Sequence, residues 1–243
     1  MQCPLGTGKT GCGKTELCAT FASAGFAVLD EGFLDMPCPS AHPQSLVMEA
    51  AWVSAWFQRV LAAHEQDPAR VMIADRSPLS AVFYTRAGQG ALLDPLIRGM
   101  YADLAEAGVE IYTVYLQVKP ATLWSRIQRR LLNEPDRVLY KEDSREWMET
   151  VLSFYEQYNN WDFVIDNSVD DRASALSDVM MEVIKGVESR SPRFRDHVSR
   201  KTWSAVSPPP RFALDNGSTN KPSPAPGVAI SATQPIALAL ADA

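Results

Sequence analysis

The chain has 243 residues, of which 46% are hydrophobic and 21% charged, too apolar for a fully disordered chain and too polar for a membrane protein. No stretch approaches the roughly 18 consecutive apolar residues of a membrane helix, so a spanning protein is excluded. The net charge of −6 divides unevenly: residues 189–243 carry seven Lys/Arg and three Asp/Glu, or +4, which leaves −10 for the preceding body. An acidic body argues against a nucleic-acid partner, which would need a basic face.

Hydrophobic periodicity predicts alternating helices and strands up to residue 187. In chain order we expect a helix at 14–23, a strand at 26–30, a helix at 44–66, a strand at 71–75, helices at 77–87 and 92–107, a strand at 111–118, helices at 120–132 and 144–158, a strand at 163–165 and a helix at 172–187. Gly25 and Gly108 are expected to end helices, and Pro120 to begin one. This alternation implies a parallel sheet flanked by helices, an α/β fold.

The chain is expected to divide into a folded domain at 1–188 and a disordered tail at 189–243. Seven prolines fall between Pro208 and Pro235, and periodicity disappears after about Ser189. Such a segment buries too little apolar area to offset the entropy of ordering it.

The cysteines indicate a reducing compartment. There are four, Cys3, Cys12, Cys18 and Cys38, and their spacing matches no zinc module. No signal-peptide pattern occurs at the start. We therefore expect thiols and a cytoplasmic protein, or a mitochondrial one if a targeting segment precedes the sequence.

A phosphate-binding loop is the sharpest motif. Residues 8–15 satisfy G-x-x-x-x-G-K-[ST] and open directly into a predicted helix. The predicted ATP-binding residues here are Gly8, Gly11, Cys12, Gly13, Lys14 and Thr15. Backbone N–H groups would bind the phosphates, Lys14 would reach the β- and γ-phosphates, and the Thr15 hydroxyl would ligate Mg²⁺. The overlapping Gly6–Thr10 copy fails because Cys3 stands where its first glycine belongs, so Lys9 is not the phosphate lysine.

The strand that normally leads into such a loop is absent from the predicted elements. Only seven residues precede Gly8, and Pro4 and Gly6 suit a central strand badly. The expected fold is therefore a P-loop kinase sheet whose first strand is missing or truncated.

A carboxylate and an arginine follow the strand at 71–75. Ligands of open α/β sheets bind at the carboxyl ends of strands. Asp75 is therefore expected at the Mg²⁺ site and Arg76 against a phosphoryl group. Switch-type ATPases usually have a glutamate directly after the strand's aspartate, where it activates water. Here Arg76 takes that position, which favours phosphoryl transfer to a bound acceptor over hydrolysis.

These motifs resemble the deoxynucleoside kinase family over about residues 8–166. Asp75-Arg76-Ser77, followed by Ser80 and Phe83-Tyr84, is similar to its [DE]-R-S motif, and Trp56-Phe57-Gln58 to its aromatic-Phe-Gln segment. The resemblance implies that Gln58 reads the nucleobase, with Trp56 beside it. Glu31, at the end of the strand 26–30, or its neighbour Asp30, would take the proton of the 5′-hydroxyl.

The helix at 120–132 resembles the segment that leads into the family's arginine-rich lid. It carries Arg126, Arg129 and Arg130, of which Arg126 and Arg130 share one helix face. Both are expected to hold ATP phosphates. Asp136-Arg137 instead resembles thymidylate kinases, related enzymes that phosphorylate a nucleoside monophosphate.

The predicted function is ATP- and Mg²⁺-dependent phosphorylation of a (deoxy)nucleoside 5′-hydroxyl, with Lys14, Arg76 and Glu31 as catalytic residues. Two alternatives stay open. One is a thymidylate-type kinase, for which Arg137 or Arg86 would bind the acceptor phosphate, and the other is a non-catalytic nucleotide-binding relative. The expected partner is a small-molecule nucleoside, and a homodimer is allowed.

Overall fold

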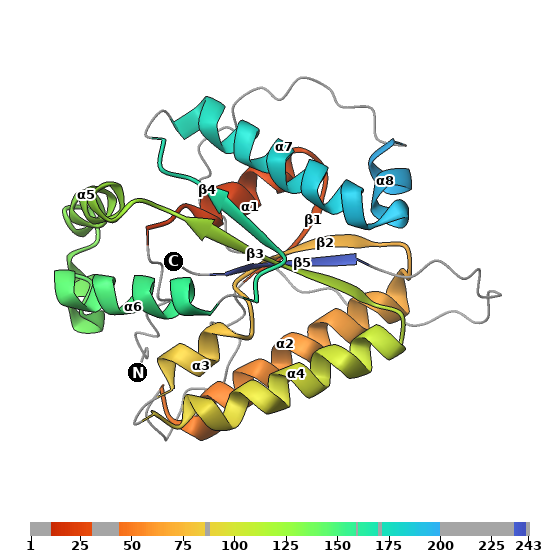
Figure 1. The fold of residues 1–243 in the computed structure, drawn as a ribbon, viewed down its shortest axis with the longest axis horizontal. Helices are drawn as coiled ribbons and strands as arrows, with labels where there is room; N and C mark the ends of the chain where they lie inside the picture. Colours follow the sequence, from red (N-terminus) through yellow and green to blue (C-terminus); the bar gives the residue numbers. More distant parts are fainter. Residues whose placement is uncertain are drawn as a thin grey trace, which may run out of the picture.

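The protein is an α/β structure built on a parallel sheet (Figure 1). The computed structural model describes residues 11–30, 44–85, 88–158, 160–169, 172–199 and 236–241. Its strands are β1 (Ala27–Leu29), β2 (Val71–Asp75), β3 (Glu110–Gln117), β4 (Phe163–Asp166) and β5 (Ile236–Ala241). They are all parallel and lie in the order β1-β2-β5-β3-β4. The predicted α/β class, with a parallel sheet flanked by helices, is confirmed.

The helices lie close to their predicted positions. They are α1 (Lys14–Ser23), α2 (Leu46–Gln66), α3 (Ser80–Tyr84), α4 (Gly90–Glu106), α5 (Pro120–Leu131), the 3-10 helix η3 (Pro135–Tyr140), α6 (Arg145–Gln157), α7 (Arg172–Arg190) and α8 (Pro192–Ser199). Gly25 and Gly108 follow α1 and α4 with φ of 82° and 84°, as predicted for helix ends, and Pro120 begins α5. Among the described helices, none combines the length and apolar character that crossing a membrane requires.

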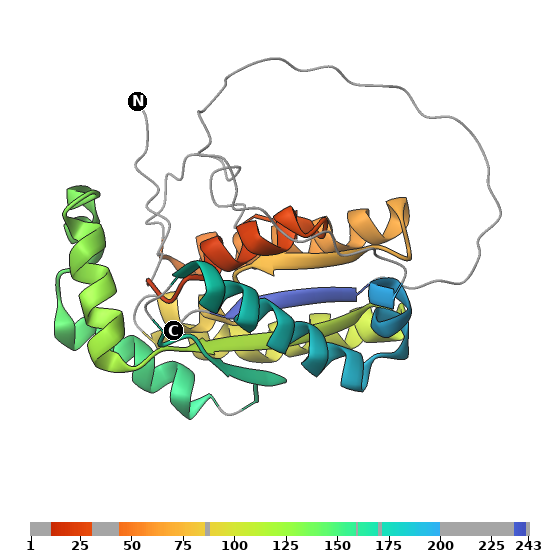
Figure 2. The same cartoon turned by 90° about the horizontal axis from the view of Figure 1, so that it is seen from above.

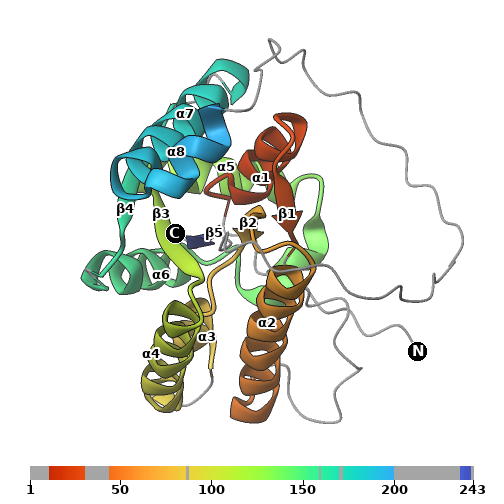
Figure 3. The ribbon, with the colours of Figure 1, turned by 90° about the vertical axis from the view of Figure 1, so that its right-hand side faces the viewer.

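The helices form two layers. Figures 1 and 3 show α1, α7 and α8 on one face of the sheet and α2, α3 and α4 on the other, while α5 and α6 lie beyond its carboxyl edge. Strand β2 alternates between the layers, as a buried strand must. Val71 and Ile73 face the first layer, and Met72 and Ala74 face the second.

Each layer has its own apolar core. The α7-side core includes Leu17, Phe21, Val71, Ile73, Val114, Leu116, Ile165, Val183, Ile184 and Phe194. The α2-side core includes Trp52, Val53, Trp56, Phe57, Val60, Met72, Ala74, Leu93, Ile97 and Leu104. A third cluster, the edge core, packs α5 and α6 against the carboxyl edge through Cys12, Tyr115, Leu123, Ile127, Met148, Val151, Leu152 and Tyr155.

The centre of the sheet differs from the prediction. Strand β5 lies between β2 and β3 and pairs with both, as Figure 2 shows. The strand predicted to be missing or truncated would lie in residues 1–10, which are outside the described residues, and the position between β2 and β3 is taken by β5. The expectation of a disordered tail is wrong for its described parts, because α7 continues to Arg190 and both α8 and β5 follow it. The partners of β5 are distant in sequence, so local periodicity carries no sign of the pairing. Residues 200–235 lie outside the described residues.

Candidate functional site

The phosphate loop adopts a backbone that requires glycine. Gly11 and Gly13 have φ of 79° and 96°, values that side chains with a Cβ rarely adopt. Gly13 is the N-cap of α1. The N–H groups in the first turn of this helix therefore point towards the space that the loop surrounds. Gly8, the first glycine of the motif, lies outside the described residues.

Asn167 holds the loop against the sheet, a role that sequence reasoning missed. Its Nδ2 donates to the Cys12 carbonyl oxygen at 2.7 Å, and its backbone N–H donates to the Gln117 carbonyl at 2.8 Å. A Cβ on Gly13 would lie 2.7 Å from the same Nδ2, so only glycine fits there. The sequence signal that could have identified Asn167 was its position directly after β4, since ligand sites lie at the carboxyl ends of strands.

Thr15 and Asp75 are brought together as predicted. The Thr15 hydroxyl donates to Asp75 Oδ2 at 2.9 Å, which joins α1 to the end of β2. The Lys14 side chain is buried in the loop, with Nζ 3.6 Å from the Cys12 sulfur. A hydroxyl and a carboxylate at one point are oxygen ligands of the kind that Mg²⁺ takes together with substrate phosphates. The described residues hold no group of three or more His, Cys, Asp or Glu side chains that could bind a metal ion. A metal site formed by such side chains alone is therefore not found among them.

An open pocket of about 340 Å³ joins this loop to α5. Its lining residues are Gly11, Cys12, Gly13, Lys14, Thr15, Glu16, Arg126, Arg129, Arg130, Asn133 and Glu134. Four cations therefore face two carboxylates. The excess positive charge beside a helix N-terminus suits an anionic ligand.

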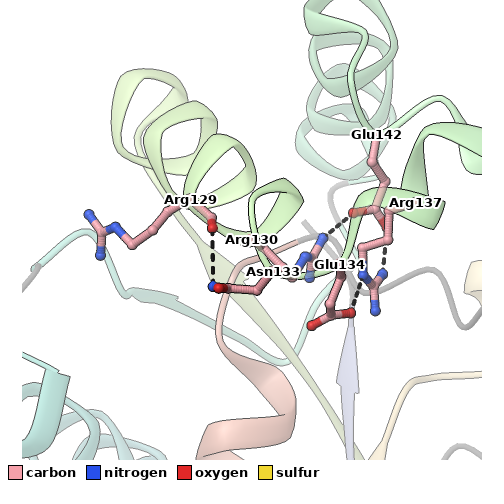
Figure 4. Close-up of polar contacts among 6 residues, drawn as sticks. All are labelled: Arg129, Arg130, Asn133, Glu134, Arg137 and Glu142. Atoms are coloured by element: carbon pink, nitrogen blue, oxygen red, sulfur yellow. Dashed lines mark hydrogen bonds and ion pairs between the residues drawn. The ribbon is translucent and has the colours of Figure 1, made fainter.

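The three α5 arginines are not equivalent. Arg126 is buried and donates to the carbonyl oxygens of Asn167 and Val169, both at 2.8 Å. It therefore fixes α5 to the loop after β4. Arg129 is exposed, and Figure 4 shows its side chain pointing away from the side on which Arg130 lies. Among the described residues, no side-chain hydrogen bond or ion pair engages the Arg129 guanidinium, which leaves it available to the pocket.

Arg130 belongs to an ion-pair network between α5 and the residues that follow it (Figure 4). It pairs with Glu142, which also accepts from Arg137 Nη1 at 2.8 Å. Arg137 pairs in addition with Glu134. Burial lowers the pKa of Arg130, with Glu142 opposing the shift. Burial also acts to lower the pKa of Arg137, but Glu134 and Glu142 outweigh it and raise that pKa above its ordinary value.

Arg76 occupies a strained and enclosed position. Its φ of 91° is unusual for a residue with a side chain and marks backbone strain of the kind found at functional sites. The guanidinium lies 4.5 Å from the Trp52 ring and 4.8 Å from the Tyr84 ring, and Nε donates to Ser80 Oγ at 2.6 Å. Only 4% of the residue is exposed, so two aromatic rings and a hydroxyl fix its charge at the end of β2.

The predicted acceptor residues are not all brought to this pocket. Trp56 is buried in the α2-side core, with its ring 5.1 Å from Phe57 and 6.4 Å from Tyr101. Gln58 is exposed on α2. Neither residue lines the pocket described above.

The carboxylates predicted at the end of β1 are only partly described. Asp30 is exposed and pairs with Arg59. It directly follows Leu29, whose register partner is Ala74. Glu31 lies outside the described residues.

Two thiols beside the loop are enclosed. Cys12 and Cys18 are buried and free, as the sequence predicted for these two. Burial raises the pKa of the Cys18 thiol well above its ordinary value; Asp75 adds to the shift, while Lys14 opposes it. The Cys18 thiol is therefore protonated at neutral pH and adds no negative charge beside the loop.

Comparison of the chain with family models, with curated proteins and with solved structures gives no match. The structure itself defines an α/β protein with a cationic pocket at the carboxyl edge of its sheet.

Proposed function

We propose that the protein is a Mg·ATP-dependent phosphotransferase of the deoxynucleoside kinase type, which transfers a phosphoryl group to a nucleoside 5′-hydroxyl. One observation carries the proposal. Residues of the phosphate loop and the α5 arginines line one open pocket, and Thr15 of that lining donates to Asp75 at the end of β2. In-line phosphoryl transfer needs positioning and charge neutralisation more than covalent help, and this set of groups supplies both.

On the donor side, the chain's own groups bind and orient a triphosphate. The N–H groups at the start of α1 and the Lys14 ammonium would hold the β- and γ-phosphates, and Arg129 would neutralise charge from the open side. Thr15 and Asp75 fit Mg²⁺, which would offset the negative charge of the phosphates when bound. Arg126 contributes indirectly, because its two carbonyl contacts set the position of α5.

On the acceptor side, the charges favour a neutral nucleoside over a monophosphate. A monophosphate acceptor would need cations of its own, and Arg137, a candidate for that role, is engaged by Glu134 and Glu142. Arg86, the other candidate, lies outside the described residues. Asp30 is compensated by Arg59, so the preference for a neutral acceptor rests on the engagement of Arg137.

The test offers the full chain Mg·ATP with deoxythymidine, deoxycytidine and deoxyadenosine, each beside its 5′-monophosphate, and measures ADP and phosphorylated product. We expect turnover of at least one nucleoside and little turnover of the monophosphates. Efficient turnover of monophosphates alone would assign the thymidylate-type reaction instead. Tight ATP binding without turnover of any acceptor would favour the non-catalytic relative.

A further inference from the structure

We infer that the space between β2 and β3 is a docking site for one extended apolar strand, that residues 236–241 of this chain fill it, and that its occupation is coupled to ligand binding at the phosphate loop. The coupling rests on the proposed nucleotide site, whereas the docking site does not.

Strand β5 joins two ladders that are otherwise separate. In the described residues β1 pairs with β2, and β4 pairs with β3, but β2 and β3 do not pair with each other. Strand β5 is in register with β2 at five positions and with β3 at six. Isolated two-stranded ladders are marginally stable at best. The five-stranded sheet therefore depends on a segment that follows α8 only after residues 200–235.

The sequence of the segment suits the site in one register. Ile236, Leu238 and Leu240 alternate with Ala237, Ala239 and Ala241. Positions 236 and 238 are level with Val71 and Ile73 of the α7-side core, and positions 237 and 239 are level with Met72 and Ala74 of the α2-side core. A shift by one residue would exchange the large and small positions. The observed register therefore sets the large residues of the segment level with the α7-side core and its alanines level with the α2-side core.

The occupant is the chain's own segment and not that of a second copy. Figures 1 and 2 show α8 and the start of β5 at the same end of the sheet. The 36 residues between Ser199 and Ile236 could extend to roughly 120 Å, far more than this connection needs. Covalent attachment through a connection of that length gives an effective concentration up to about the millimolar range, so intramolecular docking outcompetes a second copy at ordinary protein concentrations.

Docking is linked to the phosphate loop through the residues that flank β5. Leu240 is in register with Asp75, the acceptor of the Thr15 hydroxyl. Ala241 is in register with Tyr115, which packs in the edge core with Cys12. Figures 1 and 2 show the end of β5 and the start of α1 at the same edge. Because coupling is reciprocal, a ligand that orders the loop also favours the docked strand.

The test uses Ala239→Pro in the full chain. Proline removes a backbone donor that a central strand needs. Ala232→Pro, the same change outside the strand, is the matched control. We expect Ala239→Pro to lower the Tm by roughly 5 °C or more and to accelerate amide hydrogen exchange in β2 and β3, while Ala232→Pro does neither. We also expect ATP to raise the Tm of the wild type but not that of Ala239→Pro.

A synthetic peptide of residues 234–243, added to Ala239→Pro, should restore amide protection and the ATP response, and a peptide carrying the same proline should not. Equal behaviour of the two proline variants, or failure of the wild-type peptide to restore protection, would overturn the docking site. A wild-type chain whose β2 and β3 protection is lost on dilution of a dimer would assign the strand to a second copy and overturn the proposed occupant. If ATP leaves the wild-type Tm unchanged while the peptide still restores protection, the docking site stands and the nucleotide proposal falls.

Discussion

The phosphate loop and helix α2 both contact the end of strand β2, the loop through Asp75 and α2 through Arg76. The two regions are built in contrasting ways. The loop borders an open pocket, although Cys12 and Lys14 are buried. Its shape comes from backbone constraints: two glycines with positive φ and the Asn167–Cys12 hydrogen bond. Helix α2 is filled with aromatic side chains that pack in a core. Its clearest contact with the site runs through Trp52, whose ring lies against Arg76. Under the proposed function, the loop would bind the ligand directly, and α2 would support Arg76.

Substitution of Trp56 tests the α2 half of this comparison and should have the largest effect. Trp56→Ala is expected to cost about 3–5 kcal/mol of unfolding free energy, because it leaves a cavity in the α2-side core. Trp56→Phe should cost much less, because Nε1 makes no hydrogen bond among the described residues. Gln58→Ala, on the exposed side of the same helix, should change stability by less than about 0.5 kcal/mol. Urea denaturation measures all three.

The same variants test whether α2 contacts the acceptor. In nucleoside titrations, Gln58→Ala should weaken nucleoside binding by about 1–3 kcal/mol if its amide pairs with the base, and it should leave ATP affinity unchanged. A rise in nucleoside KM for Trp56→Phe at unchanged stability would show that Trp56 reaches the acceptor, contrary to its place in the core.

Substitution of Lys14 tests the loop half. Lys14→Ala should lower ATP-dependent turnover by about 10²–10³-fold, because a buried ammonium beside the transferring group is lost. Thermal stability should change little by comparison. Lys9→Ala, in the overlapping copy of the motif, should keep most of the turnover. Similar losses for the two variants would contradict the choice of register.

Two arginines of α5 allow a ligand-binding residue and a structural residue to be compared within one helix. Arg126→Ala should cost about 2–3 kcal/mol of stability, because two charge-assisted bonds to backbone carbonyls are lost. Arg129→Ala should leave stability unchanged and weaken ATP binding by about 3–10-fold, an effect that high salt reduces. Calorimetric ATP titration and thermal unfolding separate the two outcomes, and the reverse pattern would contradict the assigned roles.

Alkaline pH should produce the smallest effect. Burial raises the pKa of both Cys18 and Tyr155 well above their ordinary values. The unfolded chain therefore releases these protons from about pH 8.5–10 upward, while the folded chain retains them. Because the folded state then binds more protons, stability falls as pH rises through this window, by on the order of 1 kcal/mol per pH unit for each group. Denaturation at pH 7, 9 and 10 checks this, and Cys18→Ala should flatten the dependence.

Local patterns predicted most of the secondary structure and the backbone of the loop, because both depend on neighbouring residues. The glycine spacing, Lys14 and Thr15 define the phosphate loop within eight positions. Asp75 was placed correctly because carboxyl ends of parallel strands share one edge, and the Thr15–Asp75 hydrogen bond agrees with that reasoning.

Only the tertiary structure decided which residues face a ligand and how the sheet is completed. Arg126 and Arg129 belong to one short sequence run, yet one is buried against carbonyls and the other is exposed, because the loop after β4 covers a single side of α5. Asn167 carries no motif, and its role arises from contact with a loop 155 positions away. Strand β5 is the clearest case. Six alternating residues are too weak a local signal to define a strand, and their order comes from pairing with β2 and β3 on both sides.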